Sequence, residues 1–241
     1  MDNKQCSTRH GRLPTLERSG IRRIIQVILL LVFQGVVLFV SAGRLDWIMG
    51  WVLIGLYILA VVFNVFFVFR KNPELINERG RLAENVKGWD KVLIAVSSPL
   101  PFVTLAVAGM DAVRFGWSNM PPALLASGIV LFVVGMFLFA WAMSSNKYFS
   151  TTVRIQYDRG HQTITSGPYQ YVRHPGYMGS VLYTIGTPLL LGSWWALVPA
   201  TLAIAAITVR TALEDDTLQQ ELVGYAEYTK KVRYRLLPGV W

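Results

Sequence analysis

The sequence predicts an all-α fold, a polytopic membrane helical bundle of about six transmembrane helices with a cytosolic C-terminal amphipathic helix. Of its 241 residues, 53% are hydrophobic and only 15% are charged, whereas soluble domains carry about 25% charged residues. Several apolar segments have the length of about 17–25 residues that lets a helix cross a bilayer. The basic residues are concentrated in alternate loops. Together these observations favour a membrane protein with one helical domain.

Six apolar segments are the predicted transmembrane helices. Their approximate bounds are Ile24–Val40, Trp47–Phe69, Val92–Gly109, Pro122–Met143, Pro175–Leu191 and Trp194–Val209. Pro99 and Pro101 predict a kink in the third helix. Gly192 and Ser193 predict a tight hairpin that makes the last two helices antiparallel neighbours. The first segment ends in a weak signal-peptidase pattern, but it is longer than a usual signal peptide, so we expect it to be retained.

The basic residues predict the orientation of the helices. Of the 23 Lys and Arg residues, 21 lie in the segments 1–23, 70–91, 144–174 and 210–241. Only Arg44 and Arg114 lie elsewhere. Cytosolic loops carry an excess of Lys and Arg, and an even number of helices returns the chain to the side where it began. We therefore expect both termini, the long loop and the charged tail to be cytosolic.

The composition also argues against two kinds of binding. The formal net charge of +9 could indicate a nucleic-acid partner, but the basic residues follow the predicted membrane topology, so no nucleic acid is expected. The single cysteine, Cys6, excludes an intramolecular disulfide and a multi-cysteine metal site. The three histidines, His10, His161 and His174, have no metal-ligand spacing, so no metal is expected.

A turn at Arg173-His174-Pro175 begins the fifth predicted helix. Pro175 suits the first position of a helix, and His174 is held extended because it precedes proline. The free N–H groups and the dipole at such a helix start favour an anion. Gly176 and Gly179 permit a close approach of a ligand or another helix. The alternative is that Arg173 reaches lipid headgroups while nearby tyrosines form an interfacial belt.

Arg210 and Glu214 are the second group of candidate residues. They are four residues apart, so they share one face of a helix, and the hairpin returns them to the level of His174. An arginine beside a cavity can bind a carboxylate with two parallel hydrogen bonds. Glu214 can accept a hydrogen bond from an ammonium group or a hydroxyl group. The alternative is a surface ion pair that contributes a few tenths of a kcal/mol.

These motifs resemble the isoprenylcysteine carboxyl methyltransferase family. The pattern G-P-Y-x-x-x-R-H-P-x-Y-x-G runs from Gly167 to Gly179, and a family-like stretch from Gly160 to Gly167 precedes it. Arg210 is followed by an acidic pair and by Leu218, Gly224-Tyr225 and Tyr228, which is similar to the family as well. The resemblance is strong over residues 145–241 and weaker over residues 70–95, where Asn72–Leu75 and Lys87–Lys91 are similar to bacterial members.

The resemblance implies that S-adenosylmethionine binds in a cytosol-facing site in the C-terminal half. The residues that it assigns to the cofactor are His161, Gln162, Thr163, Ile164, Tyr169, His174, Pro175, Gly176, Tyr177 and Glu214. It assigns catalysis to Arg210 and Glu214, with Arg210 also binding the carboxylate of the acceptor. Two positions depart from the family. The acidic pair is Glu214-Asp215 where members often have two glutamates, and Arg154 stands where some have glutamine.

The resemblance also implies an activity, carboxyl O-methylation of an isoprenylcysteine-like or other lipophilic acceptor that enters from the membrane. We expect Arg173 and His174 to face the cofactor's carboxylate, and tyrosine rings to face its sulfonium cation. The chain then divides into a cytosolic arm (1–23), N-terminal membrane helices (24–144) and a C-terminal methyltransferase region (145–241). Membrane lipids are further partners, in the bacterial inner membrane or the endoplasmic reticulum; the oligomeric state stays open.

Four alternatives remain at this point. A phospholipid or other amine N-methyltransferase shares part of the first motif, although an arginine beside the acceptor disfavours an amine. A small-thiol S-methyltransferase is the second. An NADPH-dependent sterol-type reductase is the third, because Val232–Gly239 resembles the end of such proteins. A non-catalytic scaffold or transporter is the fourth, disfavoured because no charged residue lies in the middle of a predicted helix.

The predicted topology can be tested with reporter fusions. A reporter fused at residue 241 should be cytosolic, and one inserted in the segment 41–46 should lie on the opposite side of the membrane. N-terminal sequencing should show that the first helix is retained. A periplasmic or lumenal signal at residue 241, or a mature protein that begins near Gly43, would contradict this topology.

Overall fold

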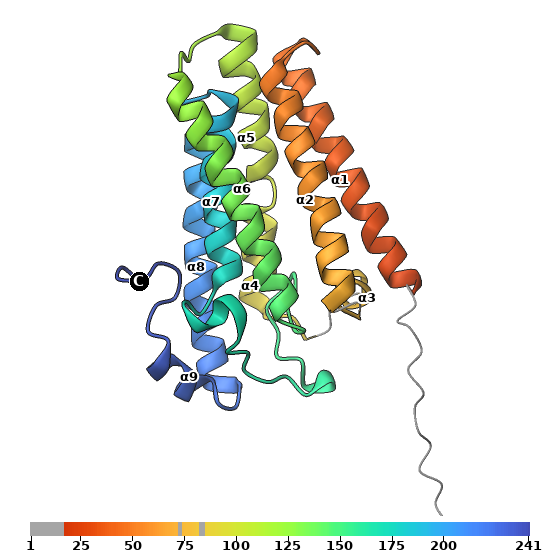
Figure 1. Ribbon diagram of the computed structural model, residues 1–241, viewed down its shortest axis with the longest axis vertical. Helices are drawn as coiled ribbons and strands as arrows, with labels where there is room; N and C mark the ends of the chain where they lie inside the picture. The colour runs from red at the N-terminus through yellow and green to blue at the C-terminus, as the bar shows by residue number, and fades with distance from the viewer. Residues whose placement is uncertain (1–16, 72–73, 82–84) are drawn as a thin grey trace, which may run out of the picture.

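The computed structural model describes residues 17–71, 74–81 and 85–241, and shows a bundle of long helices that run side by side (Figure 1). Most of the predicted basic arm, with Cys6 and His10, lies outside the described residues, as does Asn72-Pro73. All regular secondary structure in the described ranges is helical. The predicted all-α membrane bundle is therefore confirmed.

The N-terminal half contributes three of the predicted membrane crossings. The elements are α1 (Arg18–Ala42), α2 (Ile48–Lys71), α3 (Glu74–Gly80), α4 (Gly88–Ser97), α5 (Leu100–Gly109) and the π-helical turn η1 (Met110–Phe115). The predicted kink in the third crossing is a break at Ser98-Pro99, between α4 and α5. Near the break the hydroxyl group of Ser97 donates to Leu93 O at 2.7 Å.

The C-terminal half contains the remaining long helices and the loop between them. The elements are α6 (Pro122–Ser145), the 3₁₀ turns η2 (Tyr157–Arg159) and η3 (Gly167–Gln170), α7 (Pro175–Leu191), α8 (Leu197–Glu221) and α9 (Tyr225–Lys231). In the described residues, five helical stretches have at least 18 residues and are apolar enough to cross a membrane. With its 17 residues, α7 is just shorter, which accounts for the difference from about six.

The end of the chain differs from the prediction in one respect. We expected the last membrane helix to end near Val209 and a separate amphipathic helix to follow, but α8 continues without a break to Glu221. The segment 210–221 contains neither glycine nor proline, so nothing in it interrupts the backbone hydrogen bonds. The first such residue is Gly224, which has a positive φ of 83° and separates α8 from the short α9.

Glycines bring α6 and α7 into close contact along their length. A Cβ atom at Gly135 would lie 2.6 Å from Gly179 O, and one at Gly186 would lie 2.7 Å from Gly128 O. Small residues of this kind let the backbones of membrane helices approach each other. Gly179 therefore serves a helix–helix contact, which is one of the two roles that its position predicted. The contact fixes the start of α7 against the end of α6.

The segments with most of the basic residues lie at one end of the bundle. The start of α1, α3, the loop after α6 and α9 all lie at the lower end in Figure 1. The hairpin at Gly192 lies at the other end, and Ser193 there donates to the buried carboxylate of Asp111. Which end faces the cytosol stays a prediction from the basic residues.

Candidate functional site

A cavity of about 360 Å³ lies at the end of the bundle where the loop, α7, α8 and α9 meet. This volume is within the range of about 300–1,000 Å³ that small-molecule sites usually have. Most of the predicted site residues line this one cavity. They are His161, Gln162, Thr163, Ile164, Tyr169, His174, Gly176, Tyr177, Arg210 and Glu214. Pro175 does not line it, because it is buried as the first residue of α7.

The turn that starts α7 has the predicted backbone geometry. His174 is the N-cap residue, with φ −126° and ψ 61°, and the helix begins at Pro175. The C-terminal segment runs beside this turn. The N–H of Arg173 donates to Tyr234 O at 3.0 Å, and the N–H of His174 donates to Arg235 O at 2.9 Å. The residues after α9 therefore form part of the support of the site.

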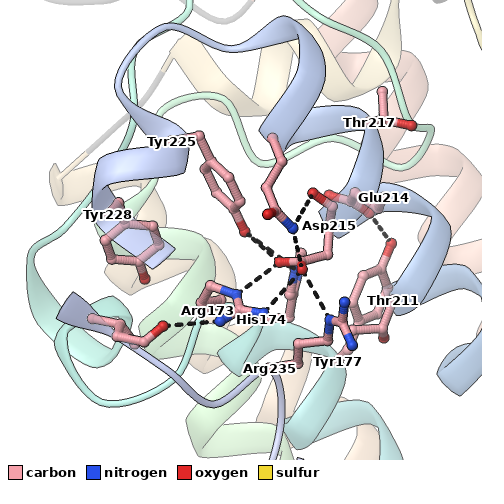
Figure 2. Close-up of polar contacts among 12 residues, drawn as sticks. Arg173, His174, Tyr177, Thr211, Glu214, Asp215, Thr217, Tyr225, Tyr228 and Arg235 are labelled. Carbon is pink, nitrogen blue, oxygen red and sulfur yellow. Dashed lines mark hydrogen bonds and ion pairs between the residues drawn. The ribbon is translucent and has the colours of Figure 1, made fainter. Parts of the chain in front are cut away.

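Asp215 lies at the centre of a buried polar network beneath this turn (Figure 2). Its carboxylate is fully buried and accepts hydrogen bonds from Arg173 Nε at 2.8 Å and Nη2 at 2.9 Å. Arg235 Nε lies 2.9 Å away, Tyr225 OH lies 3.0 Å away and His174 Nε2 lies 3.1 Å away. The network joins the start of α7, α8, α9 and the C-terminal segment.

This network corrects the expected role of Arg173. Its remaining amine, Nη1, donates to Val232 O and Arg233 O, so the guanidinium is engaged on all sides by the protein. It is 8% exposed, which also excludes the alternative that it reaches lipid headgroups. His174 lines the cavity with its ring held by Asp215 and Tyr225. Arg173 is therefore part of the structural support, whereas the contact of His174 with the cofactor stays a prediction.

Glu214 and Tyr177 face each other across the cavity wall. The hydroxyl group of Tyr177, on α7, donates a short hydrogen bond to Glu214 Oε2, on α8. Glu214 is half-buried, whereas the next residue, Asp215, is fully buried. The two members of the predicted acidic pair thus have different environments, and Glu214 is the carboxylate of this pair that reaches the cavity.

Arg210 lines the cavity but already has a carboxylate partner. Its Nε and Nη2 bind the two carboxylate oxygens of Asp90 at 2.8 and 3.2 Å, and Nη2 also donates to Thr151 O at 2.9 Å. Asp90 is fully buried and accepts the N–H of Val153 at 2.7 Å. That Arg210 binds an acceptor's carboxylate stays a prediction, with Nε and Nη2 already bound to Asp90. The pair attaches the loop to α4 and α8.

The loop side of the cavity is held by aromatic and backbone contacts. The ring of His161 lies 4.4 Å from that of Tyr148, and His161 Nδ1 accepts the N–H of Gln156 at 3.3 Å. Thr163 donates to Val223 O at 3.1 Å, which connects the loop to the junction of α8 and α9. Burial, and next the charges of Arg159 and Arg154, lower the pKa of His161 to about 4. His161 is therefore neutral at neutral pH.

Several residues of the site were not assigned a role from the sequence. Asp90 lies in the stretch Lys87–Lys91 that resembles bacterial family members, and Tyr225 lies in the family-like tail. That resemblance was the signal available for both. Tyr148 and Arg79 also line the cavity, and no motif singled them out. Tyr171, one of the tyrosines near the turn, is exposed and is not among the residues that line the cavity.

The lowered pKa of His161 predicts a pH dependence of stability. Unfolded histidine has a pKa near 6.5, so the unfolded state binds more protons between about pH 4 and 6.5, and stability should fall as the pH falls through this range. The melting temperature of the wild-type protein should therefore decrease more between pH 7 and 5 than that of His161→Gln, which has no such titration. Parallel curves for the two proteins would contradict a buried, neutral His161.

The Asp215 network predicts that the substitution Asp215→Asn strongly destabilises the protein. Asp215→Asn removes the negative charge between Arg173 and Arg235, and breaking a buried ion pair costs about 3–5 kcal/mol. Asp216→Asn is the matched control, since Asp216 is exposed and binds Gln220 within the same helix. We expect a large loss in the free energy of unfolding, measured by detergent denaturation in mixed micelles, for Asp215→Asn alone. Equal effects of the two substitutions would disagree with the network.

The fold and the site together define a helical membrane protein with a partly polar, aromatic-lined cavity at one end of its bundle. Residues 128–220 match the family described as isoprenylcysteine carboxyl methyltransferase (ICMT). The predicted resemblance to that family is confirmed over this part of the chain, which contains α7, most of α8 and the loop before them.

Curated relatives agree with this family. A probable protein-S-isoprenylcysteine O-methyltransferase from Oryza sativa subsp. indica is 29% identical over 108 residues, which are 44% of this chain and 56% of that protein. The Xenopus laevis protein-S-isoprenylcysteine O-methyltransferase is 30% identical over 143 residues, which are 58% of this chain and 48% of that protein. The Schizosaccharomyces pombe protein of that name is 28% identical over 109 residues, which are 44% of this chain and 46% of that protein.

The matched region spans about half the length of the curated relatives that it matches. The family and the relatives' names support a methyltransferase. They give no support to the N-methyltransferase, thiol methyltransferase or reductase alternatives.

Proposed function

We propose that the chain is an integral membrane methyltransferase that uses S-adenosylmethionine to methylate the carboxylate of an isoprenylcysteine-like or other lipophilic acceptor. One observation carries the proposal. The cavity that collects residues 161–164, the start of α7 and Glu214 shares Phe139, Tyr183 and Arg79 with a second, apolar cavity between α1 and α2. A water-soluble cofactor and a lipid-borne acceptor can therefore meet at one end of the bundle.

The residues of the smaller cavity fit S-adenosylmethionine in their chemistry. Glu214 can accept hydrogen bonds from an ammonium group or from ribose hydroxyls. Tyr148 and Tyr177 line the cavity and give it aromatic surface against which a base can pack. His161 is neutral and leaves that side of the cavity without a further charge. The volume of about 360 Å³ is in the usual range for ligands of this size.

The reaction makes few demands on acid–base chemistry. S-adenosylmethionine would supply a methyl group on a sulfonium, and transfer of this group to a carboxylate oxygen would leave a thioether and a methyl ester. A carboxylate with a pKa near 4 is already ionised at neutral pH, so no residue has to remove a proton. The tasks of the protein are to align the two groups and to exclude water.

The side chains of the cavity suit these tasks. Tyr177 holds Glu214 in place across the wall between α7 and α8. Arg210 holds Asp90 and the loop carbonyl of Thr151, so we assign it to positioning the loop that covers the cavity. The distribution of basic residues supports a cytosolic orientation of this end, because the cofactor is soluble and the segments with most of the Lys and Arg lie here.

The proposal can be tested by transfer of labelled methyl from S-adenosylmethionine to candidate acceptors in nanodiscs. N-acetyl-S-farnesylcysteine should be methylated and should release its label on mild base treatment, as methyl esters do. Its amide, which has no ionised carboxylate, should not react. Extracted phospholipids and a small thiol are the other acceptors. Label that is stable to base, or found on the amine or the thiol, would contradict carboxyl methylation.

The same system tests Glu214. Glu214→Gln should weaken binding of S-adenosylhomocysteine, measured by calorimetric titration, by about 10- to 100-fold, because a hydrogen bond to a charged group contributes about 1.5–3 kcal/mol. Asp216→Asn, in the same turn of α8 but exposed, is the control and should bind like the wild type. Unchanged affinity in a folded Glu214→Gln variant would remove Glu214 from the cofactor site.

A further inference from the structure

A second cavity, of about 1190 Å³, lies between α1 and α2. On α1 it extends from Arg23 to Val40, which is about 26 Å at 1.5 Å per residue and comparable to the hydrocarbon core of a bilayer. Its walls are almost entirely aliphatic and aromatic, with Leu31, Val61 and Val65 among them. The helices α1 and α2 are close near residues 43–47 and diverge toward α3 (Figure 1). We call this cavity the α1–α2 groove.

The α1–α2 groove has charged groups only near its two ends. At one end Arg44 is paired with Asp46 at 2.5 Å. At the other end are Arg23, on α1, and Arg79, on α3. Neither of these two arginines has a carboxylate partner in the described part of the chain. An apolar groove with an uncompensated positive end is complementary to an amphiphile with an anionic head.

Arg79 also lines the smaller cavity, and it differs from the other arginines there because it has no carboxylate partner within the described ranges. Among the described residues, four arginines line that cavity. Three of them are paired: Arg173 with Asp215, Arg210 with Asp90, and Arg154 with Asp158 at 3.5 Å. The contacts of Arg79 are a long hydrogen bond to Phe149 O at 3.5 Å and the ring of Phe149 at 5.5 Å. Of these four arginines, Arg79 is therefore the one without a carboxylate partner among the described residues.

The fold holds Arg79 close to a second cation. Gly80 packs against the start of α1, because a Cβ atom there would lie 1.8 Å from Ser19 O and 3.3 Å from Arg23 Cβ. Burial, and next the charge of Arg23, lower the pKa of Arg79 to about 9, so it is still a cation at neutral pH. A bound anion would compensate the buried charge of Arg79 and offset its repulsion by Arg23.

We propose that Arg79, with Arg23 beside it, binds the carboxylate of the methyl acceptor, and that the α1–α2 groove holds the acceptor's hydrocarbon chain. This inference rests on the proposed function. Arg79, Phe139 and Tyr183 belong to both cavities, so a carboxylate bound at Arg79 lies at the junction with the cofactor cavity. Arg79 suits this role better than Arg210, because Nε and Nη2 of Arg210 already bind Asp90.

Direct binding tests the inference without relying on methyl transfer. The probe is labelled N-acetyl-S-farnesylcysteine, compared with its uncharged amide, on the full chain in nanodiscs of neutral lipid. Arg79→Gln should lower the affinity for the carboxylate by about 10- to 100-fold, the usual effect of losing a charge-assisted hydrogen bond, and leave that for the amide unchanged. Arg81→Gln is the matched control, because Arg81 is an exposed neighbour paired with Glu17 and Glu78. It should bind both compounds like the wild type.

Three results would overturn the inference. The first is that Arg79→Gln binds the carboxylate probe as tightly as the wild type does. The second is that Arg79→Gln loses the same affinity for the carboxylate and for the amide. The third is full competition by phosphatidylglycerol vesicles, which would make the site a general anionic-lipid site. Binding of S-adenosylhomocysteine shows that each variant is folded. If carboxylate binding depends on Arg79 but no acceptor is methylated, the proposed function fails while the binding site stands.

A second variant keeps the test valid if Arg79→Gln does not fold. Val61→Trp places a large ring in the α1–α2 groove, about 15 Å from the end of α2 at 1.5 Å per residue. It should lower the affinity for the S-farnesyl compound at least tenfold and affect the shorter S-geranyl compound little. Equal affinities of Val61→Trp and the wild type for both compounds would show that the hydrocarbon chain does not occupy this groove.

Discussion

The site depends on one buried carboxylate, that of Asp215. Arg173, Arg235, Tyr225 and His174 all donate to it or lie within hydrogen-bond distance of it. These residues come from the turn before α7, the C-terminal segment and the start of α9, and Asp215 itself is on α8. The buried negative charge is stable because it is paired with the buried Arg173 and the half-buried Arg235 and accepts further hydrogen bonds. It adds to the backbone hydrogen bonds of Arg173 and His174 that hold the C-terminal segment against the start of α7.

The same carboxylate decides what reaches the cavity. Successive residues on an α-helix are about 100° apart, so when Asp215 faces the interior, its neighbours must face elsewhere. Glu214 turns to the cavity, where Tyr177 binds it, and Asp216 turns to the solvent. The acidic pair that looks uniform in the sequence therefore has two functions. One member supports the fold, and the other is available to a ligand.

Ion pairing also distributes the arginines between support and binding. Three of those that line the smaller cavity are paired with aspartates. Arg173 and Arg210 pair with aspartates from distant parts of the chain, and Arg154 pairs with Asp158 in the same loop. The remaining one, Arg79, is held beside Arg23 by the close contact of Gly80 with α1. Burying a charge without a partner is costly, and proteins keep such groups where a ligand supplies the counter-charge. This is the physical basis for placing the acceptor's head group at α3.

The sequence by itself determined the features that depend on neighbouring residues. Hydropathy identified the long helices, Pro175 set the start of α7, and the motif from Gly167 to Gly179 located the part of the cavity lining at the start of α7. The tertiary structure decided the partners of the charges. Asp90 and Arg210 are 120 residues apart, and Arg173 and Asp215 are 42 apart. Helix starts and apolar segments follow from local backbone geometry and solvation, whereas an ion pair forms only where packing brings two distant side chains together.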